Sequence, residues 1–301
     1  MFARHCDLLI LGALSKDIIV TPEGIEHAIG GAVVYSAVAA RRIGADLLAI
    51  TKLHPDDNAA LSVFDLHNVP HMVRKSRRTT SIRNTYHTPD RDRRTCEAIA
   101  MADPFDLDDI PPDITADVYY LGGLMKGEFP ESFVLAMAKR GKVAIDAQGF
   151  MRVNENGPMV FRDWKNKKDV IAVVHYLKTD AAEAETLTGE TDRIRAAQIL
   201  ASWGAKEVIL THSAEVLVCV DGEIFAAPFT ARNLSGRTGR GDTCFASYCY
   251  WRQHHSPEEA CRFAAALTSL KMERPGPFTG TLHDVERALA ERYRRRPESI
   301  I

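Results

Sequence analysis

Short apolar runs alternate with segments of helical spacing along most of the chain. The runs are apolar at consecutive positions, which is typical of strands that are covered on both faces of a sheet. They lie at residues 7–14, 45–53, 117–124, 142–149, 173–180 and 206–213. Helical spacing follows at residues 32–43, 58–68, 130–140, 181–188 and 193–203. This alternation predicts an α/β fold with a doubly wound, mostly parallel sheet flanked by helices.

The pattern changes after residue 213. Residues 214–230 contain two short apolar runs around Asp221-Gly222, a pair that favours a β-hairpin. Helical spacing then predicts helices at residues 243–254, 257–272 and 282–295.

One earlier segment also departs from the alternation. Residues 71–101 are rich in Arg, Thr and Tyr and are interrupted by TPDRD, so they predict a polar β-hairpin or meander with no helix of its own. Such a segment could cover a site in the main domain and exclude water from it. A solvated surface hairpin explains the same charge pattern equally well.

Composition narrows the class of partner. The 38 basic and 40 acidic residues nearly balance, so no overall charge attracts the chain to nucleic acid or to a membrane, and a small soluble partner is expected. No apolar run approaches the roughly 18 residues of a membrane helix, and Asp17 interrupts what would be a secretory signal, so we expect a cytoplasmic protein. The six cysteines show no metal-binding spacing, which predicts reduced and mostly buried thiols.

The stretch Asn233 to Trp251, NLSGRTGRGDTCFASYCYW, carries the clearest candidate chemistry. Apolar positions recur at helical spacing after Asp242, so a glycine-rich loop ends at the start of a helix. Unpaired amides and the helix dipole make such a terminus a site for anions, and glycines let the backbone approach a ligand. The simpler alternative is that Asp242 only caps the helix and the glycines form an ordinary turn. The string matches neither GxxxxGK[ST] nor a GxGxxG after the first strand.

The chain resembles the ribokinase-like, or PfkB, carbohydrate kinases at several places that occur in the order found in that family. The loop GRTGRGD resembles the signature D-T-x-G-A-G-D at Thr238, Gly239, Gly241 and Asp242. A Gly-Gly pair that opens a helix appears as Gly30-Gly31, and Asp17 after the first strand matches the usual substrate-binding aspartate. An N-x-x-E element appears with Asp180 at the Asn position and Glu183 at the Glu position.

The resemblance covers about residues 7–277 and implies a domain organisation. The ribokinase-like core would comprise residues 1–17, 31–70 and 102–301, and a β-strand lid would comprise residues 18–30 and 71–101. Lids of related kinases often pair, so the resemblance also suggests a homodimer formed through the lid.

The family chemistry is phosphoryl transfer, which needs positioning, charge stabilisation and a base for the attacking hydroxyl. By resemblance Asp242 is that base, the amides of Gly239, Arg240, Gly241 and Asp242 form the anion hole, and Asp17, Gly30 and Gly31 bind the acceptor. Lys178, Asp180, Thr211, Ser213 and Thr238 would lie on the nucleotide side. ATP would be the donor, with Asp180 and Glu183 organising Mg²⁺ and its waters.

Several positions depart from the family pattern. In the signature, Gly236 replaces the first Asp, Arg237 replaces Thr and Arg240 replaces Ala. That first Asp helps to hold a monovalent cation in ribokinases, so activation by K⁺ is not expected here. On the nucleotide side, Thr211 is kept but Ser213 replaces a glycine, which leaves the choice of nucleotide open.

The acceptor is suggested by residues 144–153, AIDAQGFMRV, which resemble the D-x-Q-x-x-x-R stretch of the myo-inositol kinase branch. That branch also carries an aromatic residue near the position of Tyr35, so Tyr35, Gln148 and Arg152 are expected on the acceptor side, although Gln148 and Arg152 are equally compatible with plain surface positions. A small polyol or sugar, with inositol first, is therefore the leading acceptor. A nucleoside kinase that stacks a base on Tyr35, Phe150 or Tyr86 is the alternative. A nucleotide-binding regulator without turnover is a third, which the presence of Asp242 disfavours.

Overall fold

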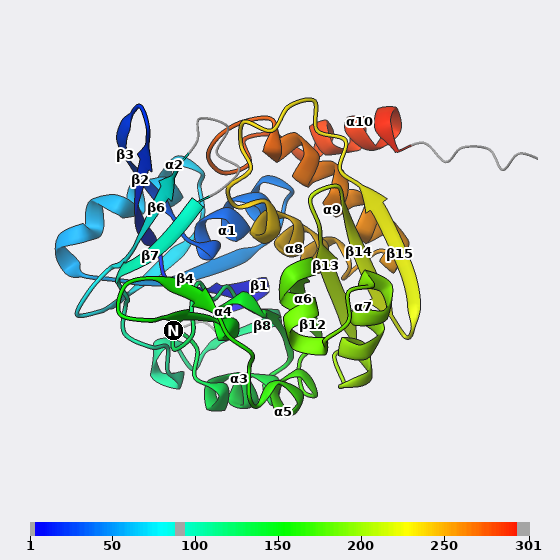
Figure 1. The fold of residues 1–301 in the computed structure, drawn as a ribbon, viewed down its shortest axis with the longest axis horizontal. Helices are drawn as coiled ribbons and strands as arrows, with labels where there is room; N and C mark the ends of the chain where they lie inside the picture. The colour runs from blue at the N-terminus through cyan, green and yellow to red at the C-terminus, as the bar shows by residue number, and fades with distance from the viewer. Residues whose placement is uncertain (1–3, 88–93, 294–301) are drawn as a thin grey trace, which may run out of the picture.

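The computed structural model describes residues 4–87 and 94–293, and its centre is a nine-stranded sheet (Figure 1). Its strands run in the order β15-β14-β13-β12-β9-β8-β1-β4-β5. All strands from β13 to β5 are parallel, and β14 and β15 continue the sheet antiparallel. Their bounds are β1 (Arg4–Leu11), β4 (Leu47–Leu53), β5 (His71–Lys75), β8 (Ile114–Leu121), β9 (Lys142–Asp146), β12 (Tyr176–Asp180), β13 (Glu207–Thr211), β14 (Glu215–Val220) and β15 (Glu223–Pro228). The predicted doubly wound, mostly parallel α/β sheet is confirmed.

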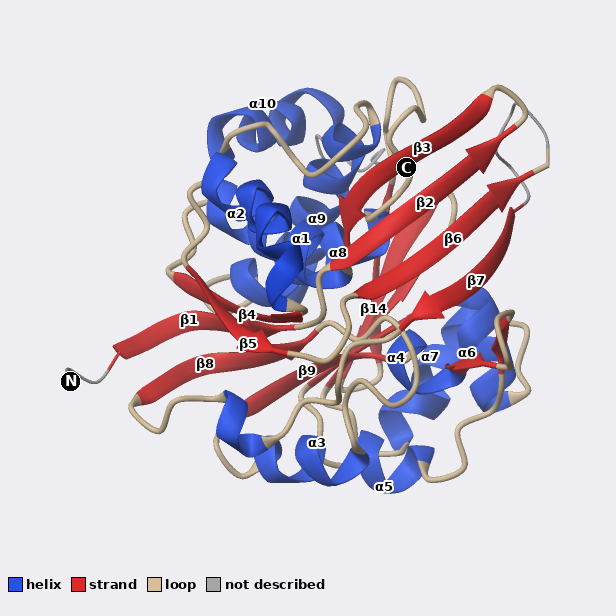
Figure 2. Ribbon diagram, turned by 90° about the vertical axis from the view of Figure 1, so that its left-hand side faces the viewer, coloured by secondary structure: helices blue, strands red, loops and turns tan. Residues whose placement is uncertain are grey.

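Helices cover both faces of this sheet (Figure 2). One face carries α1 (Ala32–Arg42), α2 (Ser62–Leu66), α8 (Arg240–Trp251), α9 (Pro257–Met272) and α10 (Leu282–Arg292). The other carries α3 (Glu131–Ala138), α5 (Lys167–Ile171), α6 (Ala181–Thr188) and α7 (Arg193–Ser202). In β1, Leu8 and Ile10 belong to the first core and Leu9 and Leu11 to the second, all fully buried. Burial on both faces explains why the strands are apolar at consecutive positions.

A second, four-stranded sheet lies beyond the end of the large sheet, and we call it the small sheet (Figure 2). Its order is β3-β2-β6-β7, built from β2 (Ser15–Thr21), β3 (Gly24–Gly30), β6 (Thr80–Tyr86) and β7 (Arg94–Ala100). The expectation that residues 71–101 form this unit as a whole is wrong for β5, which pairs parallel with β4 in the large sheet. The charges of Arg74 and Lys75 concealed this edge strand, because an edge strand has one open side where charged residues suit solvent.

Other differences from the sequence expectations are local. Residues expected as one helix at 58–68 form a 3₁₀ turn at Pro55–Leu61 followed by α2, and α10 ends at Arg292, while residues 294–295 of its expected span lie outside the described residues. The hairpin of β14 and β15 is confirmed, with left-handed backbone at Asp221 (φ 49°) and Gly222 (φ 85°). A short α4 (Gln148–Met151) and the pair β10 (Arg152–Asn154) and β11 (Met159–Phe161) were not expected.

The cysteines agree with the expectation of unpaired and mostly buried thiols. All six cysteines are free, and all except the half-buried Cys96 are buried. Within the described residues, no helix combines the length and the apolar character that crossing a membrane requires.

Candidate active site

A cavity of about 350 Å³ lies at the carboxyl ends of the central strands, between the GRTGRGD loop and the small sheet. In a parallel sheet these strand ends are where ligands bind, because the following loops and helix N-termini converge there. Of the predicted site residues, Asp17, Gly31, Tyr35, Gln148, Arg152, Lys178, Asp180, Thr211, Thr238, Gly239, Arg240, Gly241 and Asp242 line the cavity. Gly30, Glu183 and Ser213 do not.

The glycine-rich loop enters α8 through a left-handed residue, Gly239 (φ 74°), which occupies the N-cap position. A Cβ at Gly239 would lie 2.2 Å from the ring of Tyr35, so the loop needs glycine both for its backbone angle and for this close approach. Asp242 is therefore the third residue of the helix, and the interpretation of Asp242 as the helix cap is wrong.

The first turn of α8 offers amides to the cavity. Arg240 donates its amide to the carbonyl of Arg237 at 3.2 Å, so this member of the expected anion hole is used by the loop itself. The amides of Gly241 and Asp242 stand in the first turn, where helix geometry provides no acceptor within the helix. They are the groups best placed to receive an anion, and the helix dipole adds to the attraction.

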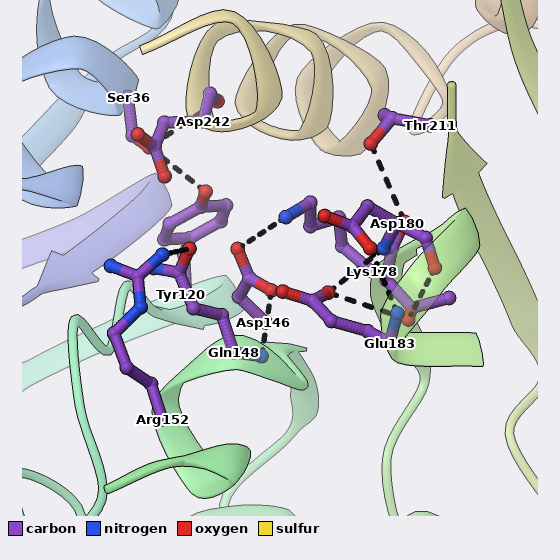
Figure 3. Close-up of polar contacts among 11 residues, drawn as sticks. Ser36, Tyr120, Asp146, Gln148, Arg152, Lys178, Asp180, Glu183, Thr211 and Asp242 are labelled. Atoms are coloured by element: carbon purple, nitrogen blue, oxygen red, sulfur yellow. Dashed lines mark hydrogen bonds and ion pairs between the residues drawn. The ribbon is translucent and has the colours of Figure 1, made fainter. Parts of the chain in front are cut away.

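Asp242 is partly buried and surrounded by charged groups. Burial and the neighbouring Asp146 carboxylate raise its pKa to about 6, against the opposing effect of Lys178. The Ser36 hydroxyl lies 3.4 Å from the backbone carbonyl oxygen of Asp242 and 2.8 Å from the buried hydroxyl of Tyr120 (Figure 3). A carboxylate with this pKa is ionised at neutral pH and still basic enough to accept a proton from a hydroxyl.

A buried ion pair faces Asp242 from the neighbouring strand ends. The Lys178 ammonium, at the end of β12, lies 2.8 Å from the Asp146 carboxylate at the end of β9, and both side chains are buried (Figure 3). Burial alone would lower the pKa of Lys178, but the carboxylates of Asp146, Glu183 and Asp180 raise it above its ordinary value. Asp146 was not predicted as a site residue, although it is the Asp of the D-x-Q-x-x-x-R stretch. The expected strand ran on to residue 149, whereas β9 ends at Asp146.

Gln148 and Arg152 meet on the opposite wall, which excludes the interpretation of the two as plain surface residues. Arg152 donates to the Oε1 atom of Gln148 at 2.5 Å (Figure 3). Its guanidinium also lies over the Phe161 ring, with 5.4 Å to the ring centroid. Gln148 is the first residue of α4 and Arg152 is the first residue of β10, and both elements follow the end of β9 directly. These contacts fix two polar side chains on the wall that faces Asp242.

The first turn of α1 and the start of the small sheet form a third wall. Gly31 has φ 103°, and a Cβ there would lie 2.5 Å from the carbonyl of Ala13, so only glycine fits. Gly30 lies behind the cavity against Asp17, since its Cβ would meet the Asp17 carboxylate at 2.8 Å. The small sheet also contributes Ser15, Ile82, Asn84 and Tyr86 to the cavity, and of these only Tyr86 was considered from the sequence.

Asp180 and Glu183 form a reciprocal capping box at the start of α6. Each backbone amide donates to the other residue's carboxylate at 2.8 Å. Burial raises the pKa of Glu183 to about 7, against the effect of Lys178. Within residues 4–87 and 94–293, no three His, Cys, Asp or Glu side chains are grouped closely enough to hold a metal ion by themselves. Mg²⁺ keeps most of its waters and takes one or two carboxylates, so Asp180 at the cavity with Glu183 behind it fits that ion.

The expected nucleotide side is only partly assembled. Lys178, Asp180, Thr211 and Thr238 line the cavity, and Thr211 donates to the carbonyl of Thr179 at 3.4 Å. Ser213 instead lies beside His212, 3.4 Å from its Nδ1 atom. Arg237 lines the cavity and was not predicted as a site residue.

The sequence matches the family model described as pfkB family carbohydrate kinase over residues 7–283, and the chain belongs to this family. It is therefore a kinase, a phosphotransferase of the ribokinase-like fold.

Relatives within the family differ in their substrates. A solved "pyrophosphate-dependent kinase in the ribokinase family", complexed with a pyrophosphate analog and myo-inositol, is 37% identical, covers 93% of this chain and 99% of its own, and superposes with a TM-score of 0.85. The cytidine kinase of Thermococcus kodakarensis is 26% identical over 85% of this chain and 91% of that protein. The ribokinase of Arabidopsis thaliana, at 18% identity and a TM-score of 0.74 over 95% of this chain and 99% of its own, agrees in fold alone.

Proposed function

We propose that this protein transfers a phosphoryl group from pyrophosphate to one hydroxyl of an inositol-like polyol. The observation that carries the proposal is the placement of Asp242, whose pKa is raised to about 6, in the first turn of α8. The amides of an anion hole and the carboxylate of a base then face the same cavity as Gln148 and Arg152.

The acceptor part of the proposal rests on the polar walls of the cavity. Asp17, Asn84, Gln148 and Arg152 offer both donors and acceptors to a molecule with several hydroxyl groups. Similar solved structures at 36–38% identity include a kinase complexed with myo-inositol and one described as a myo-inositol-1 kinase converted into a myo-inositol-3 kinase.

The donor part rests on charge. We expected ATP from the sequence, but Lys178, Arg237 and Arg240 gather around the helix start, and the apolar residues of the cavity (Ala32, Ile82 and Leu124) belong to the small-sheet end. A small, highly charged donor suits this end better than a nucleotide, whose base needs apolar surface. Similar structures are also described as pyrophosphate-dependent.

The proposed reaction follows from the positions of these groups. The acceptor oxygen attacks the phosphorus bound at the amides of Gly241 and Asp242 while its proton passes to the Asp242 carboxylate. A phosphorus–oxygen bond forms to the acceptor and the bridging bond of pyrophosphate breaks, which releases orthophosphate. The positive charges of Lys178, Arg237 and Arg240 stabilise the negative charge of the pyrophosphate during the transfer. Mg²⁺ held by Asp180, with Glu183 supporting it, would neutralise further charge on the phosphates.

A nucleoside acceptor is the second candidate, because one relative is a cytidine kinase. Two of the three aromatic residues considered for stacking a base are already occupied. Phe150 is buried and stacks on Trp164 with 4.3 Å between ring centroids, and Tyr35 packs against Gly239. Tyr86, the third of these residues, lines the cavity beside Asn84.

Donors and acceptors can be tested as a matrix. Pyrophosphate and ATP are each offered with myo-inositol, ribose and cytidine, and products are followed by phosphorus NMR, with Asp242→Asn as the inactive control. We expect a phosphomonoester and orthophosphate from pyrophosphate with myo-inositol. A product only with cytidine would favour the second candidate, and ATP use would restore the nucleotide donor. No product in any combination would favour a regulator without turnover.

A further inference from the structure

Lys271, in the last turn of α9, carries an ammonium that is buried beside the glycine-rich loop. The side chain is 2% exposed, and its Nζ atom donates to the carbonyl of Gly236 at 2.6 Å and also to the carbonyl of Thr238. The same atom lies 5.2 Å from the centroid of the Tyr35 ring. A single cation therefore joins α9, the loop and α1.

These contacts lie on the chain immediately before the anion hole. Gly236 and Thr238 precede Gly239, the residue that turns the chain into α8. The loop is also tied to the end of α9, because the amide of Gly236 donates to the carbonyl of Met272 at 2.8 Å. A displacement of the Gly236 and Thr238 carbonyls would move the amides that receive the phosphate.

The surroundings of Lys271 suit an ammonium rather than a neutral amine. Burial lowers its pKa to about 8, against the favourable charge of Asp242, so the protonated form predominates at neutral pH. Two carbonyl acceptors and an aromatic face replace the water that the charge has lost. Such compensation is what allows a charged group to be buried.

We propose that Lys271 is a positioning residue, an internal cation that fixes the loop before α8 so that the amides of Gly241 and Asp242 face the donor. The inference rests on the proposed phosphoryl transfer for its catalytic consequence. With this ammonium in place, the loop needs no dissolved monovalent cation.

Removal and replacement of the charge provide the test. Lys271→Ala leaves a space beside the two carbonyls, and Lys271 also lines a second cavity, of about 480 Å³. We expect turnover with pyrophosphate to fall by about 10²-fold, the scale of a small misplacement of reacting groups. Ammonium or potassium ions should restore part of it, while choline at equal ionic strength should not. Lys271→Met, which fills the space without a charge, should lose the same activity and show no rescue.

A matched control separates positioning from general stability. Lys52 is also buried, donates to the carbonyl of Pro104 at 2.7 Å and lies 5.1 Å from the centroid of the Phe105 ring, but it is paired with Asp109 and does not line the cavity. Lys52→Ala should lower the melting temperature with little change in turnover below that temperature. The proposal would be overturned if Lys271→Ala were as active as the wild type. It would also be overturned if ammonium or potassium failed to restore any activity to Lys271→Ala.

A readout without turnover keeps this test separate from the proposed function. Arg232 and Arg237 are exposed in the loop region and are sites for trypsin. Lys271→Ala should be cut there faster than wild type, and potassium should restore protection. If the wild type phosphorylates nothing, the proposed function fails while this assay still decides the role of Lys271. If the wild type itself required potassium for protection from trypsin, the proposed role of Lys271 as an internal cation would be wrong.

Discussion

The sharpest test of the site is Asp242→Asn, because the structure predicts opposite effects on turnover and on stability. The substitution removes the base but keeps the shape of the side chain. Turnover should fall by about 10²-fold or more, the usual contribution of a general base. The helix should remain intact, because the N-cap is Gly239 and the Asp242 side chain makes no capping bond.

The magnitude of the stability effect follows from the pKa. A carboxyl group whose pKa rises from 3.8 to about 6 on folding favours the folded state below pH 3.8 and loses this contribution as the pH rises through 6. At pH 8 the ionised Asp242 therefore costs roughly 1 to 3 kcal/mol, the lower value allowing for its partial exposure. Asp242→Asn should be more stable than wild type by about that amount at pH 8 and equal to it at about pH 3, below both pKa values.

Urea unfolding at the two pH values measures the stability, and release of orthophosphate measures turnover. The wild-type kcat/KM should fall as the pH drops below about 6, because the base must be ionised to accept the proton. Turnover of the variant within tenfold of wild type would refute the role of Asp242. A variant less stable than wild type at pH 8 would refute the account of its burial.

Four further predictions test other parts of the structure. Arg240→Ala should raise the KM for pyrophosphate several-fold in steady-state kinetics, because the guanidinium would no longer bind the donor. Unchanged KM and turnover would show that the Arg240 side chain does not contribute to donor binding. Gly239→Ala should lower turnover by about 10²-fold, because its Cβ would collide with the Tyr35 ring and shift the anion hole. Glu128→Ala should lower the free energy of unfolding by roughly 2 to 4 kcal/mol in urea titrations, because the buried Glu128 carboxylate accepts hydrogen bonds from two backbone amides that would lose their partner. An effect below about 1 kcal/mol would contradict this. Light scattering should give about twice the 33.4 kDa chain mass if the small sheet pairs two copies, and a monomer at all concentrations would exclude that.

The secondary structure could be predicted where it depends only on residues that are neighbours in the sequence. Burial on both faces produces consecutive apolar residues, so the parallel strands could be located, and Asp221-Gly222 marked the hairpin because both residues adopt left-handed backbone. The edge strand β5 was missed, because a strand with one open side need not be apolar throughout. The loop before α8 was found through its glycines, but the helix start was placed three residues late, at residue 243 instead of Arg240.

Contacts between distant segments could not be predicted in the same way. Asp146 and Lys178 form a buried pair across neighbouring strands, and nothing in either local pattern assigns the partner. Lys271 lies in the last turn of α9, a mostly buried helix, and its importance depends on a loop more than thirty residues earlier in the chain. Asp180 and Glu183 were found by resemblance, but their mutual capping shows only in the structure.

The pairing within the small sheet has a consequence for the order of folding. Ser15 of β2 lies opposite Thr80 of β6, sixty-five positions away, and β4 and β5 of the large sheet lie between them in sequence. Closing so long a loop is entropically costly until other contacts have brought the two segments together. We expect the large sheet to form first and the small sheet to add to it afterwards. Amides of β2 and β6 should then exchange with solvent through partial openings that leave β1 and β8 protected, so the acceptor side of the cavity would be the last part of the site to assemble.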